Sequence, residues 1–229
     1  MSAVSVQQLY RSLYNTKCNK ILCVGRNYVA HAKELNNPLP SEPLFFDKPH
    51  TSLLRSGSTL YLKGDSEIHH EVELGFMIGL TGKNIRAEDY DNYIEGYFLG
   101  IDWTDRDLQA VAKKNGSPWS MSKGQDGFFT ISDFVSKDRI KDPHNLDLQF
   151  KINERVAQKE NTNLMIFRVP QLIQYVSQYV TLNAGDIILT GTPAGVGPVK
   201  SGDKIEALLK QGEEILARID MKVEKASEK

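Results

Sequence analysis

Short apolar runs recur along the whole chain, and most of them are bounded by Gly or Pro. Runs of this length, rich in β-branched and aromatic residues, predict β-strands. The expected strands are 20–24, 44–46, 59–62, 71–78, 96–102, 147–152, 155–158, 186–190, 204–208 and 215–223. Asn153-Glu154 separates two of these runs closely enough to form a β-hairpin. A chain with so many short strands is expected to form a β-rich α+β fold.

Only a few segments have helical character. Short helices are expected at 28–35, 87–94, 104–115 and 165–179. Asn27 is placed to cap the first of these helices, and Pro170 lies near the start of the last. The Asn- and Pro-rich segment 36–43 is expected to be a loop. Because no repeat or linker divides the chain, we expect one catalytic domain over residues 20–229, preceded by a short N-terminal segment, residues 1–19.

The composition excludes several classes of protein. The 229 residues carry a formal net charge of -1, so nucleic acid is not an expected partner. No apolar run reaches the length of a transmembrane helix, so no membrane partner is expected. The two cysteines, Cys18 and Cys23, fit neither a disulfide framework nor a zinc motif, which favours a soluble protein in a reducing compartment. The chain has basic but no acidic side chains before Glu34, a pattern typical of a mitochondrial targeting segment. The alternative is that the N-terminus forms an ordinary short helix at 6–14. We therefore expect a mitochondrial or cytoplasmic protein.

Two glutamates in the expected strand 71–78 are spaced for one face of a sheet. Side chains alternate along a strand, so Glu71 and Glu73 project to the same side. Two like charges held this close repel unless a cation lies between them, and oxygen ligands suit Mg²⁺, Mn²⁺ or Ca²⁺. Asp102 ends an apolar strand and offers a third carboxylate. The alternative, which an isolated Glu-x-Glu pattern favours, is the solvated face of an edge strand. We assign the two preceding histidines to packing or support, because nitrogen ligands favour softer metals.

A histidine and a glutamate on the expected helix 28–35 form a candidate general base. His31 and Glu34 are three residues apart and so lie on one face of the helix. A carboxylate beside an imidazole raises its basicity and fixes its tautomer, as a base that activates water requires. The alternative is an ordinary surface pair. The loop that follows the helix favours a lid that closes over a site.

Three basic residues and a glycine-rich turn are further candidates for substrate binding. Lys48, Arg106 and Lys123 stand near turns, where each can neutralise a substrate carboxylate or a developing oxyanion. The buried strand 186–190 runs into a turn at 191–197 whose backbone N–H groups and hydroxyls can face an anion. The turn has the spacing of neither a P-loop nor a dinucleotide-binding fingerprint. A small carboxylate is therefore the ligand that suits it, and a purely structural turn is the alternative.

In this order along the chain, the motifs resemble those of the fumarylacetoacetate hydrolase family. The resemblance covers the chain from about residue 20 to its end. The motifs that carry it are Gly25-Arg26-Asn27-Tyr28 with His31 and Glu34, Phe46-Asp47-Lys48-Pro49, His70-Glu71-Val72-Glu73-Leu74-Gly75, Asp102 with Arg106-Asp107, Pro118-Trp119, Lys123, and Gly185-Asp186-Ile187-Ile188-Leu189-Thr190-Gly191-Thr192-Pro193. The short chain and the run 113–119 are most similar to the acylpyruvase and oxaloacetate decarboxylase branch.

The resemblance implies a fold, an assembly and a site. The implied fold is a β-rich mixed roll or barrel with short peripheral helices, and the implied assembly is a homodimer. The implied cofactor is Mg²⁺ or Mn²⁺. Together with the residue patterns, the resemblance assigns metal binding to Glu71, Glu73 and Asp102, catalysis to His31, Glu34 and Lys123, and substrate binding to Arg26, Lys48, Arg106 and Thr192.

Three positions depart from the pattern of the family. Asp47 stands where an apolar residue is usual before the Lys-Pro pair, and Asp105 stands where a small residue is common. Gln125-Asp126-Gly127 replaces a stretch that usually contains Phe. Because Asp105 and Gln125 are expected near the pocket, they put the substrate preference in doubt.

These observations lead to one expected function and two alternatives. We expect a Mg²⁺- or Mn²⁺-dependent enzyme that hydrolyses the C–C bond of acylpyruvates, decarboxylates oxaloacetate, or does both, because a Lewis-acidic metal stabilises the enolate that both reactions form. Stabilising the enolate and supplying a base also suit a keto–enol tautomerase or isomerase. The non-catalytic alternative is a metal-stabilised protein that binds 2-oxo acids.

Overall fold

The computed structural model describes residues 18, 20–36 and 38–226. The expected N-terminal helix at 6–14 lies outside the described residues, so the division between residues 1–19 and 20–229 stays a prediction. No helix in the described part of the chain is long and apolar enough to cross a membrane.

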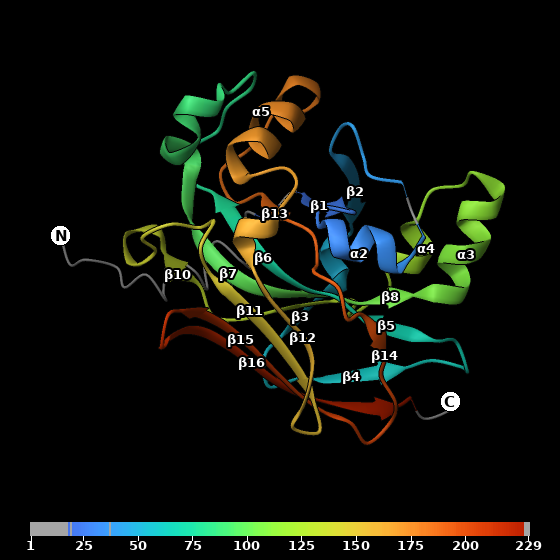
Figure 1. Ribbon diagram of the computed structural model, residues 1–229. Helices are drawn as coiled ribbons and strands as arrows, with labels where there is room; N and C mark the ends of the chain where they lie inside the picture. Colours follow the sequence, from blue (N-terminus) through green and yellow to red (C-terminus); the bar gives the residue numbers. More distant parts are fainter. Residues whose placement is uncertain (1–17, 19, 37, 227–229) are drawn as a thin grey trace.

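A mixed sheet of eight strands forms the centre of the fold (Figure 1). Its strands are β1 (Ile21–Gly25), β2 (Leu44–Lys48), β3 (Leu53–Arg55), β6 (Val72–Ile78), β7 (Ile94–Asp102), β9 (Phe129–Ile131), β10 (Val135–Ser136) and β13 (Ile187–Leu189). They follow the order β2-β1-β13-β6-β7-β9-β3, and β10 pairs with β7. β1 is parallel to β13 and β3 is parallel to β9, whereas β6 is antiparallel to both of its neighbours.

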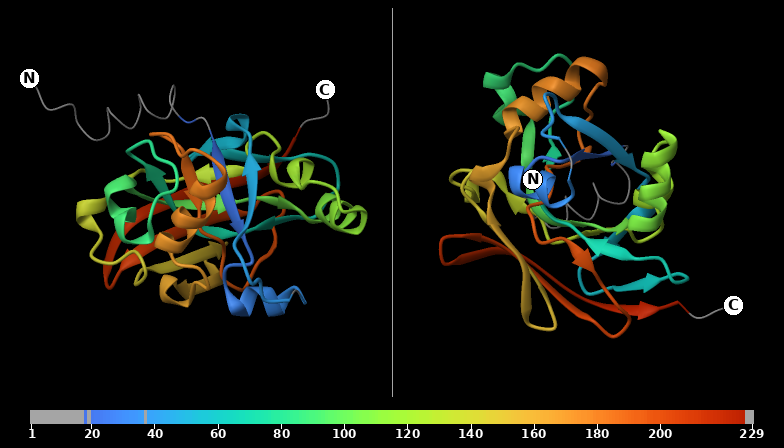
Figure 2. Two further views of the ribbon diagram at one scale, coloured as in Figure 1. Left: turned by 90° about the horizontal axis from the view of Figure 1, so that it is seen from above. Right: turned by 45° about the vertical axis from the view of Figure 1, so that its right-hand side comes forward.

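Two further sheets complete the β-rich body. The five-stranded sheet contains β4 (Thr59–Leu62), β11 (Asp147–Ile152), β12 (Arg155–Asn161), β15 (Lys204–Gln211) and β16 (Glu214–Lys225), in the order β12-β11-β15-β16-β4. The three-stranded sheet contains β5 (Ile68–His70), β8 (Thr104–Asp105) and β14 (Gly197–Pro198). Figures 1 and 2 show the yellow and red strands of the five-stranded sheet beneath the central sheet. The expected hairpin around Asn153-Glu154 is confirmed by the pairing of β11 with β12.

Burial separates the central strands from the outer ones. Every residue of β6 is buried, because sheet neighbours flank the strand and side chains cover both of its faces. Along β11, by contrast, buried residues alternate with partly buried ones, and along most of β16 they alternate with exposed ones, as in a sheet with one solvated face. Between the sheets, the Phe150 ring meets the buried Trp103 ring edge-on, with the ring centroids 6.3 Å apart. The larger core cluster therefore lies between the five-stranded and eight-stranded sheets, and a second cluster, which includes Cys23 and Met77, lies within the eight-stranded sheet.

The helices are short and peripheral (Figure 1). They are α2 (Val29–Glu34), α3 (Arg106–Asn115), α4 (Ser120–Lys123) and α5 (Val169–Tyr179), with 3₁₀ turns η1 (His50–Ser52), η2 (Ala87–Tyr93), η3 (Lys137–Arg139) and η4 (Thr162–Leu164). The helix expected at 104–115 begins only at Arg106, because Thr104 and Asp105 pair with β5 and the Asp105 side chain accepts a hydrogen bond from Leu108 N. The expected β-rich α+β fold with short peripheral helices is confirmed.

Asn27 does not cap α2, so that prediction is wrong. Its side-chain nitrogen donates to Phe167 O at 2.9 Å and to Thr190 O at 2.7 Å. Its side-chain oxygen accepts from Phe167 N at 2.7 Å. Asn27 is buried and therefore ties the start of α2 to the end of β13 and to the chain before α5.

Candidate metal centre and active site

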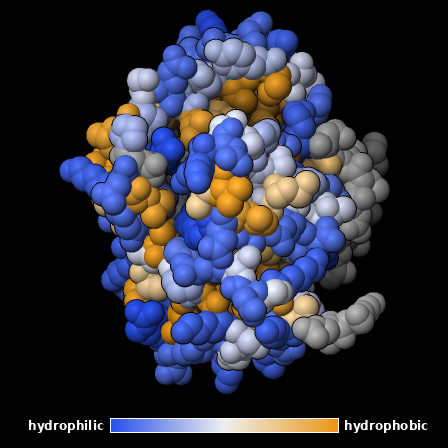
Figure 3. Space-filling view, turned by 90° about the vertical axis from the view of Figure 1, so that its right-hand side faces the viewer, coloured by the Kyte–Doolittle hydropathy of each residue, from blue (hydrophilic) through white to orange (hydrophobic). Residues whose placement is uncertain are grey.

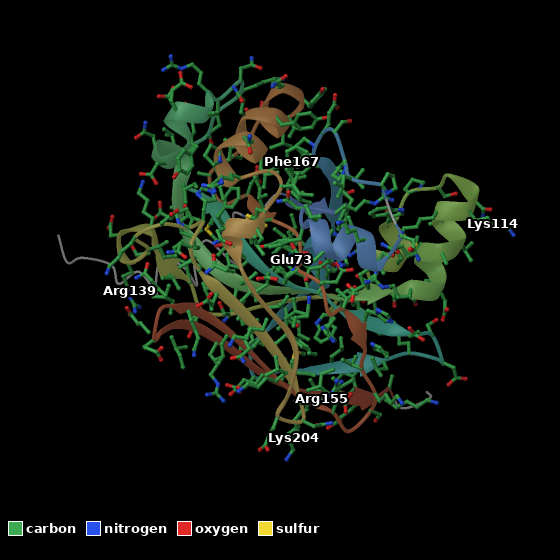
Figure 4. The ribbon with its side chains drawn as sticks, viewed as in Figure 1. Glu73, Lys114, Arg139, Arg155, Phe167 and Lys204 are labelled. Carbon is green, nitrogen blue, oxygen red and sulfur yellow. The ribbon has the colours of Figure 1, made fainter. Side chains whose placement is uncertain are left out.

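Three buried carboxylates converge at the point where β6 and β7 lie side by side. Glu71 immediately precedes β6, Glu73 lies within it, and Asp102 ends β7. Asp102 N donates to Glu71 O at 2.8 Å, which brings the two acids opposite each other. One oxygen from each of the three side chains lies within 4.8 Å of the others. Figure 4 shows Glu73 at the centre of the molecule.

The position of β6 decides between the two interpretations of the Glu-x-Glu pattern. A solvated edge strand would expose both glutamates, but Glu73 is 1% exposed and Glu71 is 5% exposed. Because β6 lies between β13 and β7, the edge-strand alternative is wrong. Three acids buried together need compensating charge.

Three cations compensate two of the three acids. Lys123 Nζ lies 2.8 Å from Glu71 Oε2 and 2.6 Å from Asp102 Oδ2. Arg106 contacts Glu71 Oε1 at 2.6 Å, and Lys48 contacts Asp102 Oδ1 at 2.6 Å. Burial opposes the ionisation of Glu71, but Lys123 and Arg106 outweigh burial and hold the pKa of Glu71 well below its usual range. Glu71 is therefore ionised in the folded protein.

Glu73 is the acid left without a cation. Its Oε2 accepts a hydrogen bond from Gly191 N at 2.7 Å, and no lysine or arginine among the described residues lies within ion-pair distance of it. Burial, followed by the nearby charges of Asp102 and Glu71, raises the pKa of Glu73 well above its usual range. A further positive charge at this point would allow all three acids to ionise together.

The donor set suits a hard divalent cation. Carboxylate oxygens are the ligands that Mg²⁺ and Mn²⁺ prefer. Each carboxylate oxygen has two lone pairs, so the contacts of Glu71 and Asp102 with Lys123 leave lone pairs for a metal. Glu73 has no cation beside it among the described residues, and a metal at this point would supply the positive charge that its ionised form lacks. The three residues therefore fit the metal expected from the sequence.

The expected base lies on the wall of the same site. His31 Nδ1 lies 3.3 Å from Glu34 Oε2, and His31 is buried. Glu34 also accepts hydrogen bonds from Gly195 N at 3.0 and 3.2 Å, which hold α2 against the glycine-rich turn. Burial lowers the pKa of His31, although Glu71 and Glu34 oppose this effect. The imidazole is therefore neutral near pH 7 and able to accept a proton.

A narrow cleft of about 30 Å³, open to solvent, reaches Glu71 and Glu73. The expected site residues that line it are Arg26, His31, Glu71, Glu73, Arg106, Lys123 and Thr192. Figure 3 shows the side of the molecule that bears α2 and α3, where hydrophilic side chains surround smaller hydrophobic patches. A volume of this size admits a metal ion or a few water molecules, which suits the floor of a metal site.

Lys48 is the expected substrate-binding residue that the structure places elsewhere. Its Nζ is buried behind Asp102 and donates to Trp103 O at 3.2 Å, to Phe128 O at 2.8 Å and to Lys123 O. Lys48 does not line the cleft. Its contacts argue for support of Asp102 and of the chain around Lys123 rather than for contact with a substrate.

Several side chains of the cleft wall were not among the residues predicted from the sequence. Gln109 and Lys113 lie on α3 and follow Arg106 by three and seven residues, so helical spacing places all three on one face. Arg106 donates to Gln109 Oε1 at 2.9 Å. Lys113 Nζ lies 5.6 Å from the centroid of the Trp119 ring, which also lines the cleft. The spacing from Arg106 was a signal that could have found Gln109 and Lys113.

Two of the departures from the family pattern have a structural role. Asp105 accepts from Leu108 N at 3.0 Å and so caps α3. Gln125 donates to Asp105 Oδ2 at 3.3 Å and to Met121 O at 3.1 Å. Neither lines the cleft, so the expected direct effect on substrate preference has no support in these contacts.

Comparison with known proteins defines the class. Residues 20–225 match the fumarylacetoacetate (FAA) hydrolase C-terminal family, and the chain belongs to this family. It is 52% identical over 190 residues to the mitochondrial oxaloacetate decarboxylase of Dictyostelium discoideum, and the aligned region covers 82% of this chain and 87% of that protein. It is 46% identical over 208 residues to a mitochondrial oxaloacetate tautomerase of Arabidopsis thaliana, and the aligned region covers 90% of this chain and 91% of that protein.

A solved structure extends the likeness to the fold. The fumarylpyruvate hydrolase of Pseudomonas aeruginosa, solved in complex with Mn²⁺ and pyruvate, superposes with a TM-score of 0.83 at 31% identity. The superposition covers 91% of each chain. The expected family is therefore confirmed, and the three relatives named here are enzymes.

Proposed function

We propose that this chain is a Mg²⁺- or Mn²⁺-dependent enzyme that hydrolyses acylpyruvates, decarboxylates oxaloacetate, or does both. The observation that carries the proposal is the buried set of Glu71, Glu73 and Asp102, in which Glu73 lacks a cation. The names of the relatives, and the Mn²⁺ and pyruvate bound to the fumarylpyruvate hydrolase, support the same chemistry.

The residues of the site have two roles: some bind the metal or stabilise charge, and His31 transfers a proton. Glu71, Glu73 and Asp102 would hold the metal, whose Lewis acidity lowers the energy of an enolate. Lys123, buried between Glu71 and Asp102, adds a fixed positive charge where the enolate develops. In C–C bond hydrolysis, His31 takes a proton from a water as the water oxygen bonds to the distal carbonyl carbon, and Glu34 stabilises the resulting imidazolium. The C–C bond to the pyruvate part then breaks, its electron pair enters the pyruvate enolate, and the proton on His31 returns to the enolate carbon.

Decarboxylation of oxaloacetate needs fewer of these groups. The C–C bond to the departing carboxylate breaks and its electron pair enters the enolate, so no water has to be activated. Lys123 stabilises the enolate, and α2, held to the turn by Glu34 and Gly195, excludes water from the cleft. His31 is therefore needed less for this reaction than for hydrolysis.

The rim of the cleft favours a substrate with two carboxylates. Arg26 and Lys113 line the cleft, and neither has an acidic partner within the described ranges of the chain. Burial, together with the nearby positive charges of Arg106 and Arg26, lowers the pKa of Lys113. A second carboxylate at this rim would relieve the repulsion between the cations. Oxaloacetate has such a group and acetylpyruvate does not.

A tautomerase is the second candidate function. Relatives at 46% identity are named oxaloacetate tautomerases, and keto–enol exchange requires only an enolate-stabilising site and a neutral base such as His31. The non-catalytic alternative, a 2-oxo acid binding protein, predicts ligand binding without turnover.

One experiment separates these candidates. The purified protein is incubated with oxaloacetate or acetylpyruvate, with Mg²⁺ or with chelator, and the products are followed by NMR. Release of CO₂ supports a decarboxylase, formation of acetate and pyruvate supports a hydrolase, and faster keto–enol exchange without loss of carbon supports a tautomerase. Binding of oxalate without any turnover would support the binding protein. Full activity in the presence of chelator would contradict the metal-dependent proposal.

We further propose a homodimer located in mitochondria. Relatives named mitochondrial support this location, and the basic, acid-free start of the sequence agrees with it. Light scattering of the purified protein should give twice the mass of one chain, and imaging of the tagged full-length chain tests the location. We also propose that residues 1–19 form a segment separate from the catalytic domain.

A further inference from the structure

A buried hydrogen-bond network behind the cleft converges on Thr192. Gln158 lies in β12, and its Nε2 donates to Thr192 Oγ1 at 2.8 Å and to Pro193 O at 2.9 Å. Its Oε1 accepts from Val72 N at 3.1 Å and lies 2.8 Å from His70 Nδ1. Both donor positions and both acceptor positions of the Gln158 amide are therefore used.

The main chain fixes the orientation of this amide. Val72 N can only donate, so the Gln158 atom that faces it must be the oxygen. Pro193 O can only accept, so the Gln158 atom that faces it must be the nitrogen. It follows that His70 carries its proton on Nδ1 and that the Thr192 hydroxyl accepts a hydrogen bond from Gln158.

The proton of the Thr192 hydroxyl is used in a hydrogen bond to the main chain. Thr192 Oγ1 lies 2.8 Å from Val72 O, an atom that can only accept. A hydroxyl has one proton and two acceptor positions, so one lone pair remains after the bonds to Val72 and Gln158 are made. Thr192 lines the cleft. Its side chain can therefore offer an acceptor to a ligand but has no proton to donate.

We propose that Gln158 is a positioning residue that holds the Thr192 hydroxyl as a hydrogen-bond acceptor for the enol hydroxyl of the substrate. The inference rests on the proposed function, because the enol form of a 2-oxo acid carries this O–H on C2. The keto form has a carbonyl oxygen there and gives Thr192 nothing to accept. Thr192 then favours the enol, and the substrate carboxylate is left to the cations of the cleft.

A pair of small ligands tests this inference. Glycolate and oxalate both carry a carboxylate and an oxygen on the adjacent carbon, but only the oxygen of glycolate is a hydroxyl. Their affinities in Mg²⁺ are measured by calorimetry for the wild type, Thr192→Val, Gln158→Met and the double variant. Thr192→Val should weaken glycolate by about fivefold to tenfold, the worth of one neutral hydrogen bond. Gln158→Met should weaken it by about threefold, because the hydroxyl remains but loses its fixed orientation.

The double variant and the second ligand provide the decisive comparison. The double variant should bind glycolate no more weakly than Thr192→Val, since both changes act through one hydroxyl. Oxalate affinity should stay within about twofold throughout, because oxalate has no proton to donate. Additive losses, equal losses for both ligands, or unchanged glycolate affinity in Thr192→Val would each overturn the inference.

Matched variants separate the role in binding from a role in folding. Thr162 is also buried, and its hydroxyl donates to Pro143 O at 2.8 Å and accepts from Leu146 N at 2.9 Å, away from the cleft. Thr162→Val should lower the melting temperature without changing glycolate affinity, whereas Thr192→Ser should retain the affinity of the wild type. If the wild type binds neither ligand and turns over no oxaloacetate, the proposed function fails. If it binds oxalate and is active but the variants change nothing, only this inference fails.

Discussion

His31 is buried beside Glu34, and burial is the main reason why the pKa of His31 lies below its ordinary value. A histidine accepts a proton only in its neutral form, so hydrolysis that depends on this base falls as the pH drops through the lowered pKa. We predict that kcat/KM for acetylpyruvate is level around neutral pH and declines only below about 6.5. The contact with Glu34 raises the pKa of His31, so Glu34→Gln should move the acidic decline to still lower pH.

The same residue distinguishes the two proposed reactions. His31→Gln should reduce acetylpyruvate hydrolysis by about 10²–10⁴-fold, the usual contribution of a general base, and abolish the acidic decline. Oxaloacetate decarboxylation, which activates no water, should lose less than about tenfold. Rates measured from pH 5 to 8 for both substrates test this. An unchanged acidic decline in His31→Gln would assign the titration to another group.

At the scale of elements, Asn27 connects α2 to two distant segments. Asn27→Ala leaves three main-chain groups, Phe167 N, Phe167 O and Thr190 O, without this partner in a buried place. We predict a loss of about 2–4 kcal/mol in the free energy of unfolding, measured in urea, because unpaired buried groups are costly. Gln178→Ala, on the exposed part of α5, is the control and should change stability by less than about 0.5 kcal/mol. A loss below about 1 kcal/mol in Asn27→Ala would contradict the role of the connection.

Strands and turns were predictable from the sequence where the spacing of neighbouring residues determines them. The period of two placed Glu71 and Glu73 on one face, and the turn at Asn153-Glu154 placed the hairpin. The roles of Asn27 and Gln158 were not predictable, because their partners lie far along the chain. Phe167 is 140 residues from Asn27, and Val72 is 86 residues from Gln158. No local periodicity encodes such contacts, which depend on how the sheets meet.

At the scale of the whole molecule, burial decides how the Glu-x-Glu pattern of Glu71 and Glu73 is interpreted. The Glu-x-Glu spacing alone favoured a solvated edge, and only the order β13-β6-β7 shows that the acids are inside. The site is thus completed by long-range packing: Glu73 on β6 bonds to Gly191, which is 118 residues away. The family order of the motifs predicted which residues meet, whereas Gln109 and Lys113 belong to no motif and only their helical spacing from Arg106 indicates them.

The acid cluster should therefore couple metal binding to the stability of the whole fold. A metal held by residues of two neighbouring strands binds the folded chain and not the unfolded one, so Mn²⁺ should raise the melting temperature of the wild type. At a concentration 100 times its Kd, the gain is about 2.7 kcal/mol. Glu73→Gln should remove this gain, because it deletes one of the three expected ligands.

The stability of Glu73→Gln relative to the wild type should change sign between chelator and Mn²⁺. Burial and the neighbouring acids already oppose the charge of Glu73, and a glutamine keeps an oxygen that can accept from Gly191 N. In chelator, the variant should be at least as stable as the wild type, whereas in Mn²⁺ it should be less stable. Glu95→Gln, on an exposed position of β7, should respond to Mn²⁺ like the wild type. Thermal unfolding of the three proteins, with Mn²⁺ and with chelator, measures the effect. A Glu73→Gln variant that gained as much from Mn²⁺ as the wild type would show that the metal binds elsewhere.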